Sequence, residues 1–474
     1  MSLSRLPGSA IITGVRSHGD LVAAGGPQFE AALVSFVADN RLPGGVAGVV
    51  YGDELAWSAG AGFADLAARR AADPAMLYAI ASITKTFTGT AIMQLRDAGQ
   101  LDLDDPAVAW LPELRQAVSP FGPIEGVTIR RMLSHESGLP AEPPGTDWAV
   151  PAYQGDPEQT LRRAGEIAVT LAPNAQHKYS DLAYQLLGAI VTRVSGIPYA
   201  DYMQDAILRP LGMAATGFAG LPGRCATGYD WRALSDELNP APAMPPAGAE
   251  GGLWSCVEDL AAWLSFQLRA HRDLPAPSPV LSAASLRQMH RPRYLAGDGW
   301  AEAWGISWCA TRQDDTTWIT HSGGVPGYTS TVCFDPETQV GAIVLLNQTT
   351  ASAALAMDLA TIARRLAQAA PPLIQPPLPA PREYLPLLGI YARPGLGGWL
   401  LRLEWRDGKL TVTTGESAAW QLVLAPTSDP DTFTIESGPG LTEERARFQR
   451  VPGGQVCSVF LMETTWERLE PAGA

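Results

Sequence analysis

Lysine is scarce in this sequence. Only Lys85, Lys178 and Lys409 occur among the 34 basic residues, so arginine supplies the other 31. Arginine keeps its proton at physiological pH, whereas lysine can release it. A chain that uses arginine wherever a plain positive charge suffices therefore indicates a special need where it retains a lysine. Lys85 follows Ser82 by three residues, one helical turn, and this pair is the first candidate for chemistry.

Positive charge is also in deficit, and long apolar runs are absent. The formal net charge is −14 and the pI is near 4.9. Nucleic acids and anionic membranes both require a basic protein face, so neither is expected as a partner. No apolar run approaches the roughly 18 residues that a membrane span needs. Residues 1–20 show no clear cleavage site. We expect a cytoplasmic protein, or a periplasmic or secreted one if a natural signal peptide was removed.

Cysteine and histidine are few and dispersed. The five cysteines are odd in number, and neither they nor the six histidines are spaced as a disulfide framework or a set of metal ligands. We expect each cysteine to be a small buried residue. The sequence predicts no metal site and no cofactor.

The segment around Ser82 predicts a buried helix that presents a nucleophile. Residues 79–95 are nearly all apolar, and Gly99 is a plausible stop signal. Ser82 would lie in the first turn, where free backbone N–H groups and the helix dipole favour an alkoxide or oxyanion. Burial disfavours a charged amine, so we expect Lys85 to exchange a proton with Ser82 near neutral pH. The alternative is a core helix with a snorkelling lysine.

Strand patterns occur at both ends of residues 26–370, and helical patterns fill the middle. This order predicts an α+β domain with one antiparallel sheet assembled from distant segments, flanked by helices, plus a helical subdomain. The predicted strands are 45–51, 55–59, 318–321, 328–334 and 340–346, and the predicted helices are 29–40, 79–95, 128–134, 182–194, 257–268 and 355–366.

The two ends of the chain are organised differently. Residues 1–25 are predicted to be an N-terminal extension, and residues 371–383 a stiff proline-rich linker. Residues 384–474 alternate at period two, which predicts a small all-β module, a barrel. Its predicted strands are 400–405, 410–414, 432–436, 447–451 and 456–462.

Two further clusters complete a set of three motifs. Tyr179-Ser180-Asp181 precedes a predicted helix, and His321-Ser322-Gly323 lies where a strand ends and a glycine-rich turn begins. With Ser82-Ile83-Thr84-Lys85 ahead of them, these motifs resemble those of the penicillin-recognising serine hydrolases. The most similar branch holds class C β-lactamases, D-aminopeptidases, DD-peptidases and related esterases. Residues 128–139 and 251–255 are similar to that family as well, and the resemblance covers about residues 25–370. The C-terminal module resembles barrels attached to some D-aminopeptidases, which implies that it either caps the site or mediates assembly into an oligomer.

The resemblance implies a β-lactamase/transpeptidase-like fold and a role for each motif residue. Ser82 would be the acylated nucleophile, Lys85 its proton partner and Tyr179 a second proton-transfer group. Which of Lys85 and Tyr179 takes the serine proton stays open. The N–H groups of Ser82 and Gly324 would form the oxyanion hole. Glycine at Gly323 and Gly324 would let the backbone approach a substrate closely.

Two positions depart from the family pattern. His321 stands where β-lactamases and transpeptidases carry a lysine, so a permanent charge for a substrate carboxylate is missing there. Asp181 stands where asparagine is usual, and an ionised carboxylate can only accept hydrogen bonds. Asp181 would either pair with Lys85 and keep it charged or receive a substrate ammonium group. His135 is expected to be structural.

These observations predict a serine hydrolase that acts through an acyl-enzyme on an ester or amide of a small molecule or short peptide. Asp181, His321 and Gly323 are its predicted substrate-binding residues. A D-amino-acid peptidase or aminopeptidase, or a β-lactamase, is the alternative within enzymes. An alternative of another class is a penicillin-binding sensor that acylates without turnover.

Overall fold

The computed structural model describes most of the chain as two compact units, Met1–Pro371 and Pro372–Ala474. The described residues are 18–146, 156–221, 223–231, 238–241, 248–272, 278–297, 299–313, 315–369, 380–393, 400–406, 408–414, 421–437 and 444–469. Most of the predicted extension and of the predicted linker lies outside these ranges.

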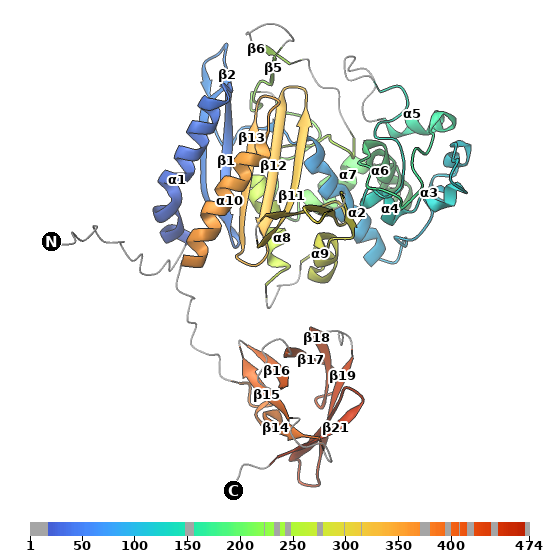
Figure 1. Ribbon diagram of the computed structural model, residues 1–474, viewed down its shortest axis with the longest axis vertical. Coiled ribbons are helices and arrows are strands. Elements are labelled where there is room, and N and C mark those ends of the chain that lie inside the picture. The colour runs from blue at the N-terminus through green and yellow to red at the C-terminus, as the bar shows by residue number, and fades with distance from the viewer. Residues whose placement is uncertain are drawn as a thin grey trace, which may run out of the picture. The chain divides into compact units, whose positions relative to one another are not determined.

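The first unit is built on a nine-stranded antiparallel sheet (Figure 1). The strand order is β3-β2-β1-β13-β12-β11-β10-β9-β8, so β1 lies beside β13, with Gly45 opposite Leu346. This confirms the prediction of one sheet assembled from distant segments. The strands are β1 (Gly44–Tyr51), β2 (Glu54–Asp65), β3 (Arg70–Ala71), β8 (Tyr294–Leu295), β9 (Glu302–Trp304), β10 (Cys309–Gln313), β11 (Thr316–Val325), β12 (Tyr328–Asp335) and β13 (Val340–Leu346).

Helices cover both faces of this sheet (Figure 1). Helices α1 (His18–Asp39) and α10 (Ser352–Ala369) pack on one face, and α8 (Val257–Arg269) packs on the other. Alternate residues of β1 therefore enter different cores: Val49 contacts the α1/α10 side, and Val50 the α8 side. Because both faces are buried, β13 is buried at every position.

The helical subdomain follows the first strands. Ser180 caps α6 by accepting a hydrogen bond from the Ala183 N–H at 3.0 Å, and the helix ends at Gly196, whose φ is +71°. These signals explain why the predicted helix 182–194 is confirmed. The helices here and nearby are α2 (Thr84–Asp97), α3 (Ala107–Trp110), α4 (Ile129–Leu133), α5 (Pro157–Arg162), α6 (Asp181–Ser195), α7 (Tyr199–Met203) and α9 (Ala283–His290). Two small two-stranded sheets complete the unit, β4 (Tyr78–Ala79) with β7 (Trp254–Ser255) and β5 (Tyr229–Trp231) with β6 (Leu238–Pro240).

The predicted helix 79–95 is wrong at its start. Tyr78–Ala79 is strand β4, Ala81–Ile83 is one turn of 3₁₀ helix, and α2 begins only at Thr84. Several buried positions of this helix are threonines, and backbone carbonyls accept hydrogen bonds from the hydroxyls of Thr86 and Thr90. The Thr86 hydroxyl donates to the Ile83 oxygen at 2.8 Å, and the Thr90 hydroxyl to the Thr86 oxygen at 2.9 Å. The buried position of the helix is as predicted.

The second unit is a closed eight-stranded barrel, which confirms the predicted barrel. Its interior is filled by alternate residues such as Leu401, Leu403 and Trp466. The sequence patterns missed β14, β17 and β21, of which β14 and β21 have only four and five residues. The strands are β14 (Gly389–Ala392), β15 (Leu400–Arg406), β16 (Lys409–Thr414), β17 (Gln421–Pro426), β18 (Thr432–Ser437), β19 (Arg445–Arg450), β20 (Val456–Leu461) and β21 (Thr464–Arg468). Among the described residues of either unit, we find no helix with the length and apolarity that crossing a membrane requires.

Candidate active site

The turn that carries Ser82 is fixed from two sides. The Ile80 N–H donates to the Leu253 oxygen at 2.9 Å, and the Ser330 hydroxyl of β12 donates to the Ile80 oxygen at 2.8 Å. Ala81, which lies between Ile80 and Ser82, has a φ of +46°, a left-handed conformation that non-glycine residues rarely adopt. Such strain persists only where the surroundings impose it, and it is concentrated at functional sites. The fold therefore holds Ser82 in a strained turn between the sheet and α2.

Lys85 is the electrostatic centre of the site. Its side chain is 0% exposed and forms an ion pair with Asp181. Its Nζ also donates to the Ser82 Oγ at 2.9 Å and to the Glu250 carbonyl oxygen at 2.6 Å. An ammonium group has three N–H donors, and here three acceptors surround it. The structure thus brings Ser82, Lys85 and Asp181 together, as the sequence motifs suggested.

The expectation of an easily deprotonated Lys85 is wrong for this arrangement. Burial alone would lower the pKa of Lys85, but the charge of Asp181 and the interaction with Tyr179 outweigh burial and raise it. Of the two roles predicted for Asp181, the geometry contains the first, in which the carboxylate pairs with Lys85 and keeps it charged.

Tyr179 lies beside the same ammonium group. The Lys85 Nζ is 5.0 Å from the centre of the phenol ring. Burial raises the pKa of Tyr179, and although Lys85 acts in the opposite direction, the net effect is a raised pKa. The neutral phenol is therefore the resting form of Tyr179, with a proton available to donate.

His135 supports Tyr179 from behind. The two rings are stacked with their centres 4.2 Å apart, and the Trp304 ring lies perpendicular to His135 with the ring centres 4.7 Å apart. The His135 Nδ1 accepts the Ser180 N–H at 3.1 Å, and burial drives the imidazole pKa well below its usual value. His135 is thus neutral, and these contacts hold it against the phenol ring.

Strand β11 brings the third motif to the nucleophile. The motif lies within the strand, and the prediction that the strand ends at His321 is wrong. A Cβ built on Gly323 would lie 2.2 Å from the Ile80 oxygen and 3.0 Å from the Ser82 nitrogen, whereas one on Gly324 would have no described atom within 4 Å. The packing of the protein itself therefore requires glycine at Gly323 and leaves room for a side chain at Gly324, and the close approach of a substrate to both glycines stays a prediction.

His321 occupies the family's cation position as a neutral side chain. Its Nδ1 lies 2.8 Å from the Ser322 carbonyl oxygen, and because a carbonyl only accepts, Nδ1 carries the proton. Burial first, and the charge of Lys85 second, lower its pKa to about 3. The buried Nε2 has no hydrogen-bond partner in the described part of the chain. The site therefore offers an acceptor here instead of a positive charge.

Glu250 is the site residue that sequence reasoning missed. Its backbone binds Lys85, and its buried Oε2 has no hydrogen-bond partner among the described residues. Burial raises the pKa of this carboxyl group. The only available signal was its position directly before Gly251-Gly252, a stretch already noted for its resemblance to the family.

A cavity of about 320 Å³ adjoins the motif residues and is lined in part by Tyr179, Trp304 and His321. Its volume lies in the range of small-ligand pockets. In the described ranges, no three His, Cys, Asp or Glu side chains are grouped as metal ligands.

The sequence of this chain is similar to those of known proteins. The family model described as Beta-lactamase matches residues 29–366. Protein flp of Staphylococcus aureus strain N315 is 27% identical over 332 residues, which are 68% of this chain and 62% of that protein. The chain thus spans less than two thirds of that relative. The D-alanyl-D-alanine-carboxypeptidase/endopeptidase AmpH of Escherichia coli K12 is 27% identical over 277 residues, 57% of this chain and 70% of that protein.

A solved structure supports the same fold. The octameric penicillin-binding protein homologue from Pyrococcus abyssi aligns with a TM-score of 0.62 at 24% identity, covering 93% of this chain and 99% of that one. The family model spans more than half of the chain, and the described fold agrees with it. The chain therefore belongs to the β-lactamase family of serine hydrolases.

Proposed function

We propose that this chain hydrolyses small esters and amides through an acyl group carried on Ser82. The observation that supports this most is the 2.9 Å contact between the Lys85 Nζ and the Ser82 Oγ in a strained, buried turn. Acyl transfer needs a serine nucleophile beside a group that can move its proton, here Lys85, and backbone N–H groups close by, here those of β11.

Acylation requires a place for the Ser82 proton. Lys85 is already an ammonium ion, so we propose that it passes one proton to the Asp181 carboxylate as it accepts the proton of Ser82. Asp181 becomes the neutral acid, Lys85 stays charged, and the alkoxide attacks the substrate carbonyl carbon. The N–H groups of Ser82 and Gly324 would stabilise the oxyanion, each by about 3 kcal/mol.

The leaving group then needs a proton. Tyr179 rests as a neutral phenol, so it is suited to protonate a departing amine or alkoxide as the tetrahedral intermediate collapses. Water attacks the acyl-enzyme in the second half-reaction, Asp181 returns its proton through Lys85 to Ser82, and Tyr179 recovers its own from the water. Tyr179 as the base for Ser82 is the competing route.

Two variants separate these routes. If Asp181 is the final proton acceptor, Asp181→Asn slows acylation by every substrate. Tyr179→Phe should then slow amides far more than p-nitrophenyl esters, because p-nitrophenolate leaves without a proton. Equal losses on both substrate classes in Tyr179→Phe, with Asp181→Asn near wild type, would favour Tyr179 as the base.

His321 shapes the substrate proposal. With a neutral imidazole at the family's cation position, a substrate carboxylate gains no charge partner there. We therefore propose substrates without an anionic group beside the scissile bond, and we expect β-lactams to be turned over less efficiently than such substrates.

An aminopeptidase is the second candidate. The Glu250 Oε2 and the His321 Nε2 have no hydrogen-bond partner among the described residues, and both groups interact electrostatically with Lys85, as Asp181 does. They are the acceptors that a substrate ammonium group would need. The similarity to AmpH, whose name describes action on D-alanyl-D-alanine, makes D-amino-acid amides and peptides the substrates to test first.

The experiment compares p-nitrophenyl butyrate, D- and L-alanine p-nitroanilide, N-acetyl-D-alanine p-nitroanilide and nitrocefin, with Ser82→Ala as the control. Turnover of the ester and the neutral acetylated amide supports the first proposal. A strict requirement for a free amine supports the aminopeptidase. A stable acyl adduct, detected by the intact mass of the protein and formed without turnover, would instead indicate the penicillin-binding sensor.

Assembly is a separate proposal. The Pyrococcus abyssi homologue is octameric, and we propose that this chain also assembles, with its barrel taking part. Sedimentation of the full chain gives its mass directly, and a monomer at micromolar concentration would rule this out.

A further inference from the structure

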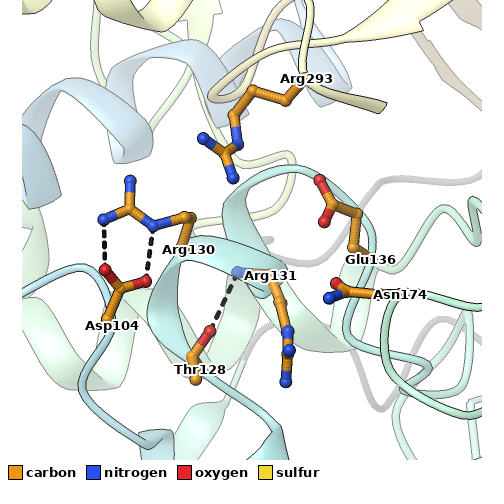
Figure 2. Close-up of a pocket in the computed structure, with 7 residues that line it drawn as sticks. All are labelled: Asp104, Thr128, Arg130, Arg131, Glu136, Asn174 and Arg293. Carbon is orange, nitrogen blue, oxygen red and sulfur yellow. Dashed lines mark hydrogen bonds and ion pairs between the residues drawn. The ribbon is translucent and has the colours of Figure 1, made fainter. Parts of the chain in front are cut away.

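A second cavity, of about 310 Å³, lies in the helical subdomain and shares no lining residue with the cavity beside Tyr179 (Figure 2). Charged and polar side chains make up its whole lining, and they come from segments far apart in the sequence. The lining residues are Asp104, Thr128, Arg130, Arg131, Glu136, Asn174 and Arg293.

Two of the three arginines already have partners. Arg130 binds both carboxylate oxygens of Asp104, at 2.6 and 2.7 Å. Arg131 donates to the Gly126 carbonyl at 2.6 Å, and its guanidinium points away from Glu136 in Figure 2. These contacts join α4 to two segments that precede it, so they account for Arg130 and Arg131 without a ligand.

Glu136 and Arg293 are different, because no hydrogen bond to a described residue holds the Glu136 Oε1 or the Arg293 guanidinium, although Arg130 lies near enough to act on Glu136 electrostatically and Asp104 on Arg293. Glu136 is 5% exposed, and its buried Oε1 has no hydrogen-bond partner among the described residues. The Arg293 guanidinium likewise makes no hydrogen bond or ion pair within the part of the chain that the structure describes. Figure 2 shows both charged ends facing the cavity, with the Asn174 amide beside Glu136.

The backbone holds Glu136 in this position. Its N–H donates to the Arg131 oxygen at 2.8 Å, and its carbonyl accepts the Asn174 N–H at 2.9 Å. A buried carboxylate oxygen without a hydrogen-bond partner destabilises the folded protein. A ligand that supplies a donor to Glu136 would remove this destabilisation.

The charges select the kind of ligand. A simple anion would meet Arg293 but would be repelled by Glu136, and a simple amine would meet Glu136 but would be repelled by the neighbouring arginines. A zwitterion satisfies both, with its carboxylate on Arg293 and its ammonium on Glu136. The Asn174 amide can both donate and accept, so it fits either end. We propose that this cavity binds a free α-amino acid.

Calorimetric titration of the Ser82→Ala protein with D- and L-alanine tests the proposal. Alanine should bind the parent protein, and Arg293→Ala and Glu136→Gln should each weaken binding at least tenfold. The matched controls Arg115→Ala and Glu337→Gln remove exposed charges elsewhere and should change nothing. Asp181→Asn, in the candidate active site, should also leave alanine affinity unchanged.

Two alanine derivatives that each lack one charged group give a second test, which does not depend on Glu136→Gln alone. N-acetylalanine lacks the ammonium group, so it should bind Glu136→Gln at least as well as the parent protein. Alaninamide lacks the carboxylate, so it should bind Arg293→Ala no worse than the parent protein. Absence of alanine binding at tens of millimolar, equal affinity in Arg293→Ala and its control, or loss of binding in Asp181→Asn alone would each overturn the proposal.

Discussion

The chain places its positive charges in two contrasting ways. At the nucleophile, the fully buried Lys85 donates hydrogen bonds to Ser82 and the Glu250 carbonyl and forms an ion pair with Asp181. In the polar cavity of Figure 2, arginines bind Asp104 and a backbone carbonyl near solvent. Arginine supplies permanent charge with fixed geometry, whereas lysine can hand a proton on. Lys85 is therefore retained at the place where we propose that the proton of Ser82 moves.

Exchanging the two residue types is the strongest way to break this comparison. Lys85→Arg keeps the charge but removes the transferable proton and adds bulk, so we expect hydrolysis to fall by about 10²–10⁴-fold. The matched change Arg130→Lys should leave the rate within about twofold. Steady-state kinetics on one ester substrate measures both, and near-normal activity in Lys85→Arg would show that Lys85 transfers no proton.

Close packing around the nucleophile gives the next largest effect. Gly323→Ala places a methyl group against the Ile80 oxygen and the Ser82 nitrogen, so it should cost about 1 to 3 kcal/mol of unfolding free energy and most of the activity. Gly324→Ala meets no described atom and should be nearly neutral for stability. Thermal unfolding and kinetics of the pair check this, and equal damage from both variants would contradict the described approach of β11.

The buried histidine gives a pH-dependent effect. His321 has a folded pKa of about 3, below its unfolded value near 6.5. Between these values only the unfolded chain binds this proton, so His321 makes the protein less stable as the pH falls. His321→Asn should reduce the slope of unfolding free energy against pH in this window by about 1.4 kcal/mol per pH unit. An unchanged slope would mean that His321 titrates normally in the fold.

The smallest expected effect lies in the arginine region. Asp104→Asn weakens a bidentate pair whose carboxylate is largely exposed, so it should cost less than about 1 kcal/mol and leave hydrolysis unchanged. Urea unfolding of this variant beside Asp181→Asn compares an exposed pair with a buried one. A larger loss from Asp104→Asn would reverse the comparison.

The sequence predicted most of the fold because its signals are local. Period-two strands, the Ser180 cap and the Gly196 stop all depend on near neighbours. The start of α2 failed because Tyr78–Ala79 pairs with Trp254–Ser255, a partner far along the chain. The short strands β8 and β9 and the barrel strand β14 carry too few residues for a pattern.

The candidate site followed a similar division. Motif order brought Ser82, Lys85 and Asp181 to attention before any geometry was known. The charge state of Lys85 could not be decided from the sequence. It depends on whether burial, which lowers the pKa of Lys85, or the charge of Asp181, which raises it, has the larger effect in the folded protein. Glu250 was missed because a single carboxylate beside two glycines carries no periodic or motif signal.

The central claim is that Ser82 carries the acyl group. Intact-mass spectrometry of the rapidly quenched protein with a slowly deacylating ester, followed by peptide mapping, tests it most directly. We predict one acyl group on the peptide that contains Ser82, and none in Ser82→Ala. An adduct on another residue, or undiminished turnover by Ser82→Ala, would contradict the account.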